Sequence, residues 1–246
     1  MKINFGSLLP GAQNAKGLTV IIDVFRAFTC APLLFSLGIK QSILVGSPSD
    51  ALKLKQTDPS LILVGEVGGA PIDGFDFGNS PSHLLCTNST FFKGKTVVQR
   101  TSSGVQGALA ALAVADEVLL GSYALAKSTA KYILSKNPEE VSLVAMGWNL
   151  EVIAPEDEWC GRYIAHLLGS SHYDHVQALR EIVYHETAQK FLRGDVSYFP
   201  AEDPLLCLQR DLHDFALRAE KEKGLVIVKK VDLNHSSYYI SEAFKK

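Results

Sequence analysis

Short runs of apolar residues recur along the chain, and most of them lack polar alternation. They are rich in valine, isoleucine and leucine, and they span residues 18–22, 42–45, 61–64, 96–98, 117–120, 141–145 and 225–231. Strands that helices cover on both faces have this uninterrupted apolar character. The pattern therefore predicts a mostly buried parallel or mixed sheet.

Segments of helical pattern separate the apolar runs, at residues 31–37, 50–55, 107–113, 124–134, 157–168, 175–191 and 203–223. Strands that alternate with helices are typical of the α/β class, and buried strands favour a layered α/β/α sandwich. No proline-rich linker or low-complexity tract marks a boundary in the 246 residues. We therefore predict a single α/β domain over residues 1–246.

Two stretches of the chain, residues 19–47 and 96–122, follow the same order of features. Each contains an apolar strand, a polar loop, an apolar helix and a second strand that ends in Gly-Ser, at Gly46-Ser47 and Gly121-Ser122. The spacing within the two stretches differs slightly. An internal duplication and a chance similarity of two strand–loop–helix units are both open.

Charge and cysteine content limit the partners of the chain. With 24 basic and 26 acidic residues the net charge is −2, so no global positive field attracts nucleic acid or an anionic membrane. No apolar run approaches the roughly 18 residues of a membrane span. Four scattered cysteines and the lack of a signal-peptide pattern favour a reducing cytoplasm. We expect a small-molecule partner, and a homo-oligomer is possible.

Polar side chains follow several of the apolar runs. In open α/β sheets ligands bind outside the carboxyl ends of the strands, so these residues are the candidates for a site. The first run is followed by Asp23, Arg26 and Thr29, the third by Glu66, the fourth by Arg100, Thr101, Ser102, Ser103 and Gly104, and the sixth by Glu156 and Asp157. A further loop, rich in turn formers and oxygen donors, contains Asp76, Asn79 and Ser80.

The loop from Arg100 to Gly104 precedes an apolar helix and can bind phosphate. Its backbone N–H groups and hydroxyls would lie at the positive end of the helix dipole, and Arg100 adds a bidentate donor. The alternative is an ordinary helix cap by Ser102 or Ser103. Arg26 has an alternative of the same kind, because it could form a buried ion pair with Asp23.

Carboxylates without matching histidine or cysteine favour magnesium over zinc. We predict Mg²⁺ as the cofactor, with ligands among Asp23, Glu66, Asp76, Glu156 and Asp157. Glu156 and Asp157 follow Pro155, however, where acidic residues also cap helices.

Other chemistries have weaker support. We expect His166, His172, His175 and His185 to be surface or core residues, because no second histidine completes a zinc-binding pattern. A cysteine nucleophile at Cys30 or Cys160 lacks a paired histidine in sequence. No glycine-rich nucleotide loop is present.

The motifs together resemble the 2-phosphosulfolactate phosphatase family. They are Asp23-Val-Phe-Arg26-Ala, Gly65-Glu66 with Gly68-Gly69, Gly74-Phe-Asp76-Phe-Gly78-Asn79-Ser80-Pro81, Thr101-Ser-Ser-Gly104, and Glu156-Asp157 with Cys160-Gly161. The resemblance implies a layered α/β/α fold and magnesium-dependent hydrolysis of 2-phospho-3-sulfolactate to 3-sulfolactate and phosphate, a step of coenzyme M synthesis.

The resemblance also implies roles for the site residues. Arg26, Arg100 and the loop from Thr101 to Gly104 would bind phosphate, with Thr29, Asn79 and Ser80 also in the substrate site. Asp23 or Glu66 would be metal ligand or base for an attacking water.

The sequence departs from the family pattern at Phe28, Cys30, Ser103 and Val105, where hydroxyl or amide side chains are usual. Another small phosphorylated 2-hydroxy acid, or non-catalytic binding of a phosphorylated metabolite, is therefore the alternative function.

Overall fold

One mixed sheet of ten strands runs through the protein, in a computed structural model that describes residues 1–233. The strand order is β1-β8-β2-β7-β9-β10-β3-β6-β4-β5. The strands are β1 (Lys2–Ser7), β2 (Leu18–Ile22), β3 (Gln41–Leu44), β4 (Ile62–Val67), β5 (Ala70–Pro71), β6 (Thr96–Arg100), β7 (Glu117–Gly121), β8 (Glu140–Ala145), β9 (Phe215–Glu222) and β10 (Leu225–Asp232). The last part of the predicted domain, residues 234–246, lies outside the described residues.

Helices lie on both sides of this sheet, which gives the predicted layered α/β/α architecture. They are α1 (Leu8–Gln13), α2 (Ala27–Ser36), α3 (Pro48–Thr57), α4 (Pro81–Leu85), α5 (Gly104–Ala111), α6 (Ala126–Lys136), α7 (Pro155–Leu167), α8 (His175–Tyr184), α9 (Glu186–Leu192) and α10 (Glu202–Cys207). Two short 3₁₀ helices, η1 (Ser89–Phe91) and η2 (Tyr123–Leu125), complete the described elements.

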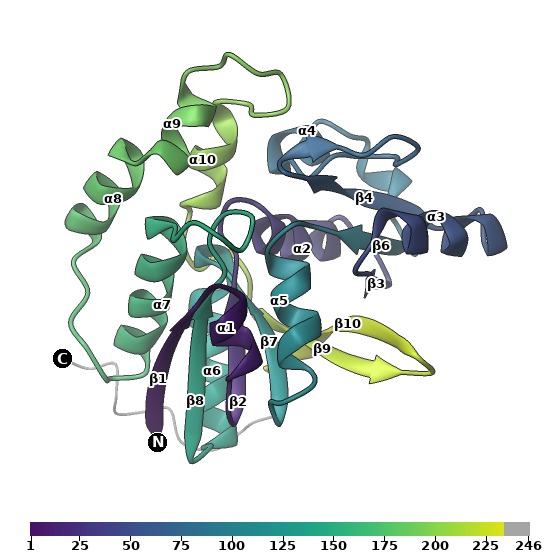
Figure 1. The fold of residues 1–246 in the computed structure, drawn as a ribbon. Coiled ribbons are helices and arrows are strands. Elements are labelled where there is room, and N and C mark those ends of the chain that lie inside the picture. The colour runs from purple at the N-terminus through teal and green to yellow at the C-terminus, as the bar shows by residue number, and fades with distance from the viewer. Residues whose placement is uncertain (234–246) are drawn as a thin grey trace.

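The sheet consists of two parallel blocks joined by an antiparallel hairpin. Strands β1, β8, β2 and β7 form one block, β3, β6 and β4 form the other, and the β9–β10 hairpin pairs with β7 on one side and β3 on the other. The blocks run in different directions, and the carboxyl ends of β2, β4 and β6 converge near the centre of the molecule (Figure 1). This convergence brings loops from the two blocks to one place.

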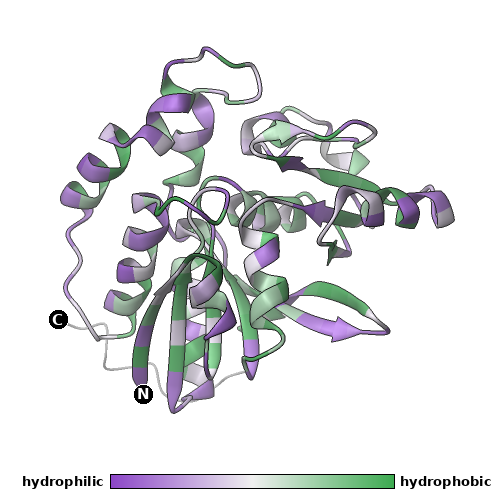
Figure 2. Cartoon of the chain, viewed as in Figure 1, coloured by the Kyte–Doolittle hydropathy of each residue, from purple (hydrophilic) through white to green (hydrophobic). Residues whose placement is uncertain are grey.

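Burial on both faces explains the apolar runs. In β2, Leu18, Val20 and Ile22 pack in a cluster with α6 and α7, whereas Ile21 packs in the cluster that contains α2 and α5. In β4, Val64 faces the α2 cluster and Leu63 faces a third cluster with α3. The strands of both blocks are accordingly apolar along much of their length (Figure 2).

Strand pairing supports the repeat suggested by the sequence. The segment β2-α2-β3 crosses from the first block to the second, and β6-α5-β7 crosses back. Strand β2 pairs with β7 and β8, and β6 pairs in the same parallel sense with β3 and β4. The strand order therefore reads alike from either end when β2 is matched with β6, β7 with β3, and β8 with β4.

Some predicted elements are wrong. The helix expected over residues 203–223 is limited to α10, and the helix-forming residues that follow belong to β9, where pairing with β7 and β10 outweighs local propensity. The helix expected over residues 175–191 breaks at His185, whose extended backbone separates α8 from α9. The first strand, β1, was not predicted.

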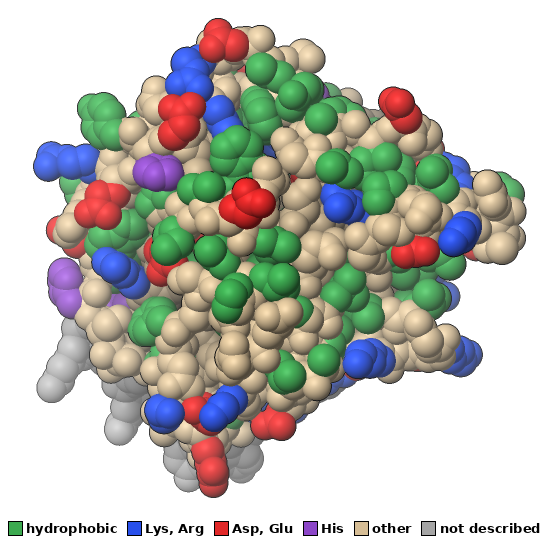
Figure 3. Space-filling view, viewed as in Figure 1, with side chains coloured by type: hydrophobic (Ala, Val, Ile, Leu, Met, Phe, Trp, Pro, Cys, Tyr) green, Lys and Arg blue, Asp and Glu red, His purple; other side chains and the backbone are tan. Residues whose placement is uncertain are grey.

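No helix in the described part of the chain is long and apolar enough to cross a membrane. Acidic and basic side chains are interspersed over the face seen in Figure 3.

Candidate active site

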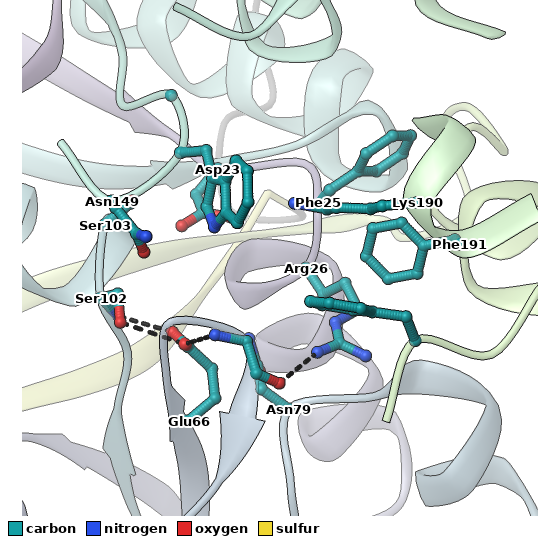
Figure 4. Close-up of a pocket in the computed structure, with 14 residues that line it drawn as sticks. Asp23, Phe25, Arg26, Glu66, Asn79, Ser102, Ser103, Asn149, Lys190 and Phe191 are labelled. Carbon is teal, nitrogen blue, oxygen red and sulfur yellow. Dashed lines mark hydrogen bonds between the residues drawn. The ribbon is translucent and has the colours of Figure 1, made fainter. Parts of the chain in front are cut away.

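A pocket lies where the loops after β2, β4, β6 and β8 meet a wall formed by α9 and the segment after it. It holds about 360 Å³ of free space, part of it open to solvent. Figure 4 shows its side chains converging from these elements. The lining residues are Asp23, Phe25, Arg26, Glu66, Gly69, Asn79, Ser102, Ser103, Gly147, Trp148, Asn149, Lys190, Phe191 and Phe199.

Asp23 joins the two halves of the sheet at the base of this pocket. Its carboxylate accepts hydrogen bonds from Ala27 N at 3.1 Å and from Gly104 N at 2.7 Å, so it connects the first turns of α2 and α5. Burial, with a contribution from the negative charge of Glu66, raises the pKa of Asp23 to about 7. A Cβ on Gly104 would lie 2.7 Å from an Asp23 carboxylate oxygen, so only glycine fits this close approach.

Glu66 is the second acidic residue of the pocket. Its oxygens accept from Ser102 N at 2.5 Å, from Ser102 Oγ at 3.0 Å and from Gly69 N at 2.6 Å. Gly69 has a φ of +88°, and a Cβ there would lie 2.5 Å from the Phe199 ring. The Glu66 carboxylate therefore ties the loop after β6 to the tight β4–β5 turn.

Arg26 has a different ion-pair partner from the predicted one. Its Nη1 lies 2.9 Å from an oxygen of Asp203 in α10, and both side chains are buried, whereas Arg26 and Asp23 form no ion pair within 4.0 Å. Nη1 also donates to Tyr198 O at 2.7 Å, and Nη2 donates to Gly69 O at 3.2 Å. The sequence could not suggest Asp203, because it is distant in the chain and lay in a predicted helix.

Lys190 supplies a second cation from α9. Its Nζ lies 3.6 Å from the centre of the Trp148 ring, and the rings of Phe191 and Phe199 are within 5.4 Å. Burial, which outweighs the attraction of nearby carboxylates, lowers the pKa of Lys190 to about 8. The described part of the chain places no carboxylate within 4.0 Å of this ammonium group.

Several predicted site residues serve the scaffold around the pocket. Thr29 Oγ1 donates to Val24 O at 2.9 Å, and Thr101 Oγ1 accepts from Val105 N, in the first turn of α5, at 3.0 Å. Ser80 Oγ donates to Asp203 at 3.0 Å. Arg100 donates to the backbone oxygen of Glu66 at 2.6 Å. These residues position the loops and are not among those that line the pocket.

Only part of the predicted carboxylate set lines the pocket. Asp76 forms an ion pair with Lys55 and accepts from Leu63 N at 2.8 Å, outside the pocket. Asp157 accepts from Val24 N at 2.7 Å and Gly147 N at 2.9 Å, which fixes the loops after β2 and β8 from beneath. Only Asp23 and Glu66 of the predicted metal ligands line the pocket.

Glu156 is also buried behind the pocket wall, where it accepts from Thr187 Oγ1 at 2.7 Å. Burial raises the pKa of Glu156 to about 7 and that of Asp157 well above its usual value. Over residues 1–233, no group of three histidine, cysteine or acidic side chains could by itself hold a metal ion. A metal here would take its remaining ligands from water and substrate.

Cysteine chemistry has no support in the structure. Cys30 and Cys160 are both fully buried, and burial raises the pKa of each thiol well above its usual value. A buried neutral thiol is a poor nucleophile. His185 accepts from Thr187 N at 3.3 Å as the cap of α9, and none of the histidines of the described chain lines this pocket.

The aromatic and amide side chains of the pocket were not predicted from the sequence. Trp148 and Asn149 follow β8, so the rule that pointed to the other strand ends could have found them. Lys190, Phe191 and Phe199 follow no strand. They reach the pocket only because α9 and α10 fold back over the strand ends, and no local motif signals that.

Comparison with known proteins identifies relatives of the chain. The sequence profile of a family described as 2-phosphosulpholactate phosphatase matches residues 7–213. A Bacillus subtilis (strain 168) protein named probable 2-phosphosulfolactate phosphatase is 30% identical over 217 residues, which cover 87% of this chain and 92% of that protein.

Proteins of the same name from Caldicellulosiruptor saccharolyticus and Deinococcus radiodurans match over shorter stretches. The first is 39% identical over 152 residues, or 60% of this chain and 61% of the relative. The second is 34% identical over 140 residues, or 57% of each chain.

Proposed function

Because the chain belongs to the 2-phosphosulfolactate phosphatase family, we propose that it is a magnesium-dependent phosphatase that hydrolyses 2-phospho-3-sulfolactate to 3-sulfolactate and phosphate. The observation that carries the proposal is one pocket whose lining includes the carboxylates of Asp23 and Glu66 together with the cations of Arg26 and Lys190. A pocket that only bound an anion would have no use for these two acids beside it. Acids and cations together suit a phosphate ester with its metal ion.

The donor set of the pocket fits Mg²⁺. Magnesium is usually held by one or two carboxylates, several waters and the phosphate oxygens of a substrate. Glu66 would hold it, because an ionised carboxylate offers about four acceptor positions and Glu66 uses only some of them in its described hydrogen bonds. When bound, the ion would offset charge on the phosphoryl group and lower the pKa of a bound water.

The side chains of the pocket would orient the phosphoryl group. Arg26 keeps N–H donors beyond those that bind Asp203 and backbone oxygens. Ser103 precedes α5, so its hydroxyl and the positive helix end lie near the same point. Donors held in place before the reaction stabilise charge that develops in the transition state.

Hydrolysis requires a water to attack phosphorus while the bond from phosphorus to the ester oxygen breaks. The water loses a proton, and the departing alkoxide gains one. Asp23 suits the acceptance of that proton because its pKa is raised to about 7, close to the working range of a general base. Glu66, held by Ser102 and Gly69, suits a fixed ligand role.

The test is phosphate release from purified protein. Substrates would include 2-phospho-3-sulfolactate, 2-phospholactate and 3-phosphoglycerate, each with chelator, Mg²⁺ or Zn²⁺. We expect Mg²⁺-dependent release that is fastest with 2-phospho-3-sulfolactate. Faster release from 2-phospholactate would assign another phosphorylated 2-hydroxy acid as substrate, and binding without turnover would refute catalysis.

Two matched variants complete this test. Asp23→Asn removes a pocket carboxylate, whereas Asp76→Asn removes one that the sequence placed in the site and the structure places outside it. We expect the first to lose turnover and the second to keep it. Equal losses in both would contradict the assignment of the pocket.

We also propose that the enzyme acts in the cytoplasm. All four cysteines are free, and Cys30, Cys160 and Cys207 are buried as separate thiols. A reducing compartment preserves such thiols.

A further inference from the structure

The ammonium group of Lys190 is held by aromatic rings and not by oxygen atoms. Nζ lies 3.6 Å from the Trp148 ring centre, 5.4 Å from that of Phe191 and 5.2 Å from that of Phe199. Its three N–H groups donate no hydrogen bond to the described residues, whereas the neighbouring Gln189 and Arg193 each donate one or more. Its side chain points into the pocket from the wall opposite Ser102 and Ser103 (Figure 4).

A second cation lies against the same rings. The guanidinium carbon of Arg26 is 5.1 Å from the centre of Phe191 and 5.4 Å from that of Phe199. The charge of Arg26 opposes protonation of Lys190, so the two cations repel each other. The buried carboxylate of Asp203 offsets the charge of Arg26, whereas the carboxylates that attract Lys190, those of Glu156, Glu66 and Asp23, form no ion pair with it within 4.0 Å.

Asn79 is also unpartnered. Its side chain lines the pocket and is 96% buried, and its Oδ1 has no hydrogen-bond partner in the described structure. Buried polar groups without partners are rare in folded proteins, and an amide and an ammonium group around one pocket indicate a polar ligand. The ammonium group favours a ligand that is anionic near it.

We propose that Lys190 is a specificity-determining residue that binds a second anionic group of the substrate, a carboxylate attached to the carbon that carries the phosphate. This inference rests on the proposed phosphatase function and names the substrate class that the pocket selects. The phosphoryl group is expected at Asp23 and Glu66 with the metal ion, on the side of the strand ends. The rest of the substrate then faces the wall formed by α9, which presents Lys190.

Two phosphate esters of nearly equal shape test this role. In 2-phospholactate a carboxylate is attached to the phosphate-bearing carbon, and in isopropyl phosphate a methyl group replaces it. We expect the native enzyme to favour 2-phospholactate in kcat/KM, and Lys190→Met to reduce that preference by about tenfold to a hundredfold, the range for a lost hydrogen bond to a charged group. The reduction should come mainly from KM for 2-phospholactate, and Lys190→Arg should restore part of it.

A matched control comes from the surface. Lys230 also stacks on an aromatic ring, with Nζ 4.1 Å from the centre of Phe215, but lies outside the pocket. Lys230→Met should leave the preference unchanged. If Lys190→Met lowers kcat/KM equally for both esters, Lys190 acts on the phosphoryl group or on the fold and the inference is wrong. An unchanged preference would also overturn it.

Failure of the proposed function would give a different result, because the native protein would then release phosphate from neither ester. Calorimetric binding of 2-phospholactate still tests Lys190 in that case. Binding that is at least tenfold weaker in Lys190→Met than in Lys230→Met would support its role in binding the anion. Equal binding by the two variants would overturn the inference.

Discussion

Replacement of Asp203 by alanine should destabilise the protein strongly, because it leaves the charge of Arg26 buried without a partner. The side chains of Arg26 and Asp203 are 3% and 0% exposed, and their charged atoms lie 2.9 Å apart. Asp203 also accepts from Ser80 Oγ at 3.0 Å and from Ser82 N and Oγ at 3.0 Å and 2.7 Å. Removal of one partner from such a buried pair costs about 3–5 kcal/mol of unfolding free energy.

Urea unfolding, monitored by circular dichroism, measures this loss of unfolding free energy. For a chain of this size a loss of about 3–5 kcal/mol corresponds to a fall of roughly 6–20 °C in Tm. The control is Glu186→Ala, which removes an ion pair with Arg193 whose side chains are 64% and 47% exposed. We expect the control to change stability little, since exposed pairs contribute little. A loss in Asp203→Ala no larger than in the control would refute the reasoning.

Further predictions concern the residues around the pocket. Burial raises the pKa of Glu156 from 4.5 to about 7, so the folded state retains this proton as pH rises and its stability should fall between about pH 4.5 and 7. In urea unfolding, the Glu156→Gln variant should lose at least about 1 kcal/mol less unfolding free energy than the native protein over that pH range. An equal loss in the two proteins would contradict the buried environment of Glu156. Gly104→Ala should lower phosphate release at least about tenfold, because its Cβ would lie 2.7 Å from Asp23; near-native rates would contradict this close packing. Asp76→Ala should leave the Mg²⁺ concentration for half-maximal activity unchanged, and a clear rise would make Asp76 a ligand.

The apolar runs predicted the interior of the sheet well, because strands that are buried on both faces consist mainly of apolar residues. Strand β2 coincides with its predicted run, and β3, β6, β7, β8 and β10 differ from theirs by a few terminal residues. Strand β9 was misjudged, since its Ala, Leu, Arg, Glu and Lys residues favour a helix locally. Its pairing with β7 and β10 is a tertiary effect that local propensity does not contain.

Part of the site was predicted from the positions of its residues at the ends of the apolar runs. Asp23, Glu66, Ser102 and Ser103 lie at strand ends, where topology places ligands, and the structure brings them together. The loop from Asp73 to Pro81 carries Asn79 into the pocket but leaves Asp76 outside it. A motif identifies residues that fold together, but it does not show which side chains point into the pocket and which support its walls.

The α9 wall could not be derived from local pattern. Lys190 lies in a short helix whose placement depends on distant contacts, such as that of Asp203 with Arg26 and that of Thr187 with Glu156. The residues that make these contacts are far apart in the chain. Prediction of this wall therefore required knowledge of how the helices pack over the strand ends.

The most direct test of magnesium-dependent phosphatase activity is the rate of phosphate release from 2-phospho-3-sulfolactate as Mg²⁺ is returned to chelator-treated enzyme. We expect no release without metal and a saturable rise with Mg²⁺. At saturating Mg²⁺, Glu66→Gln should be at least about a hundredfold slower, a loss of roughly 2.7 kcal/mol of transition-state stabilisation. Full turnover in chelator, or equal rates for the native enzyme and Glu66→Gln, would contradict the assignment of the pocket as a magnesium-dependent phosphatase site.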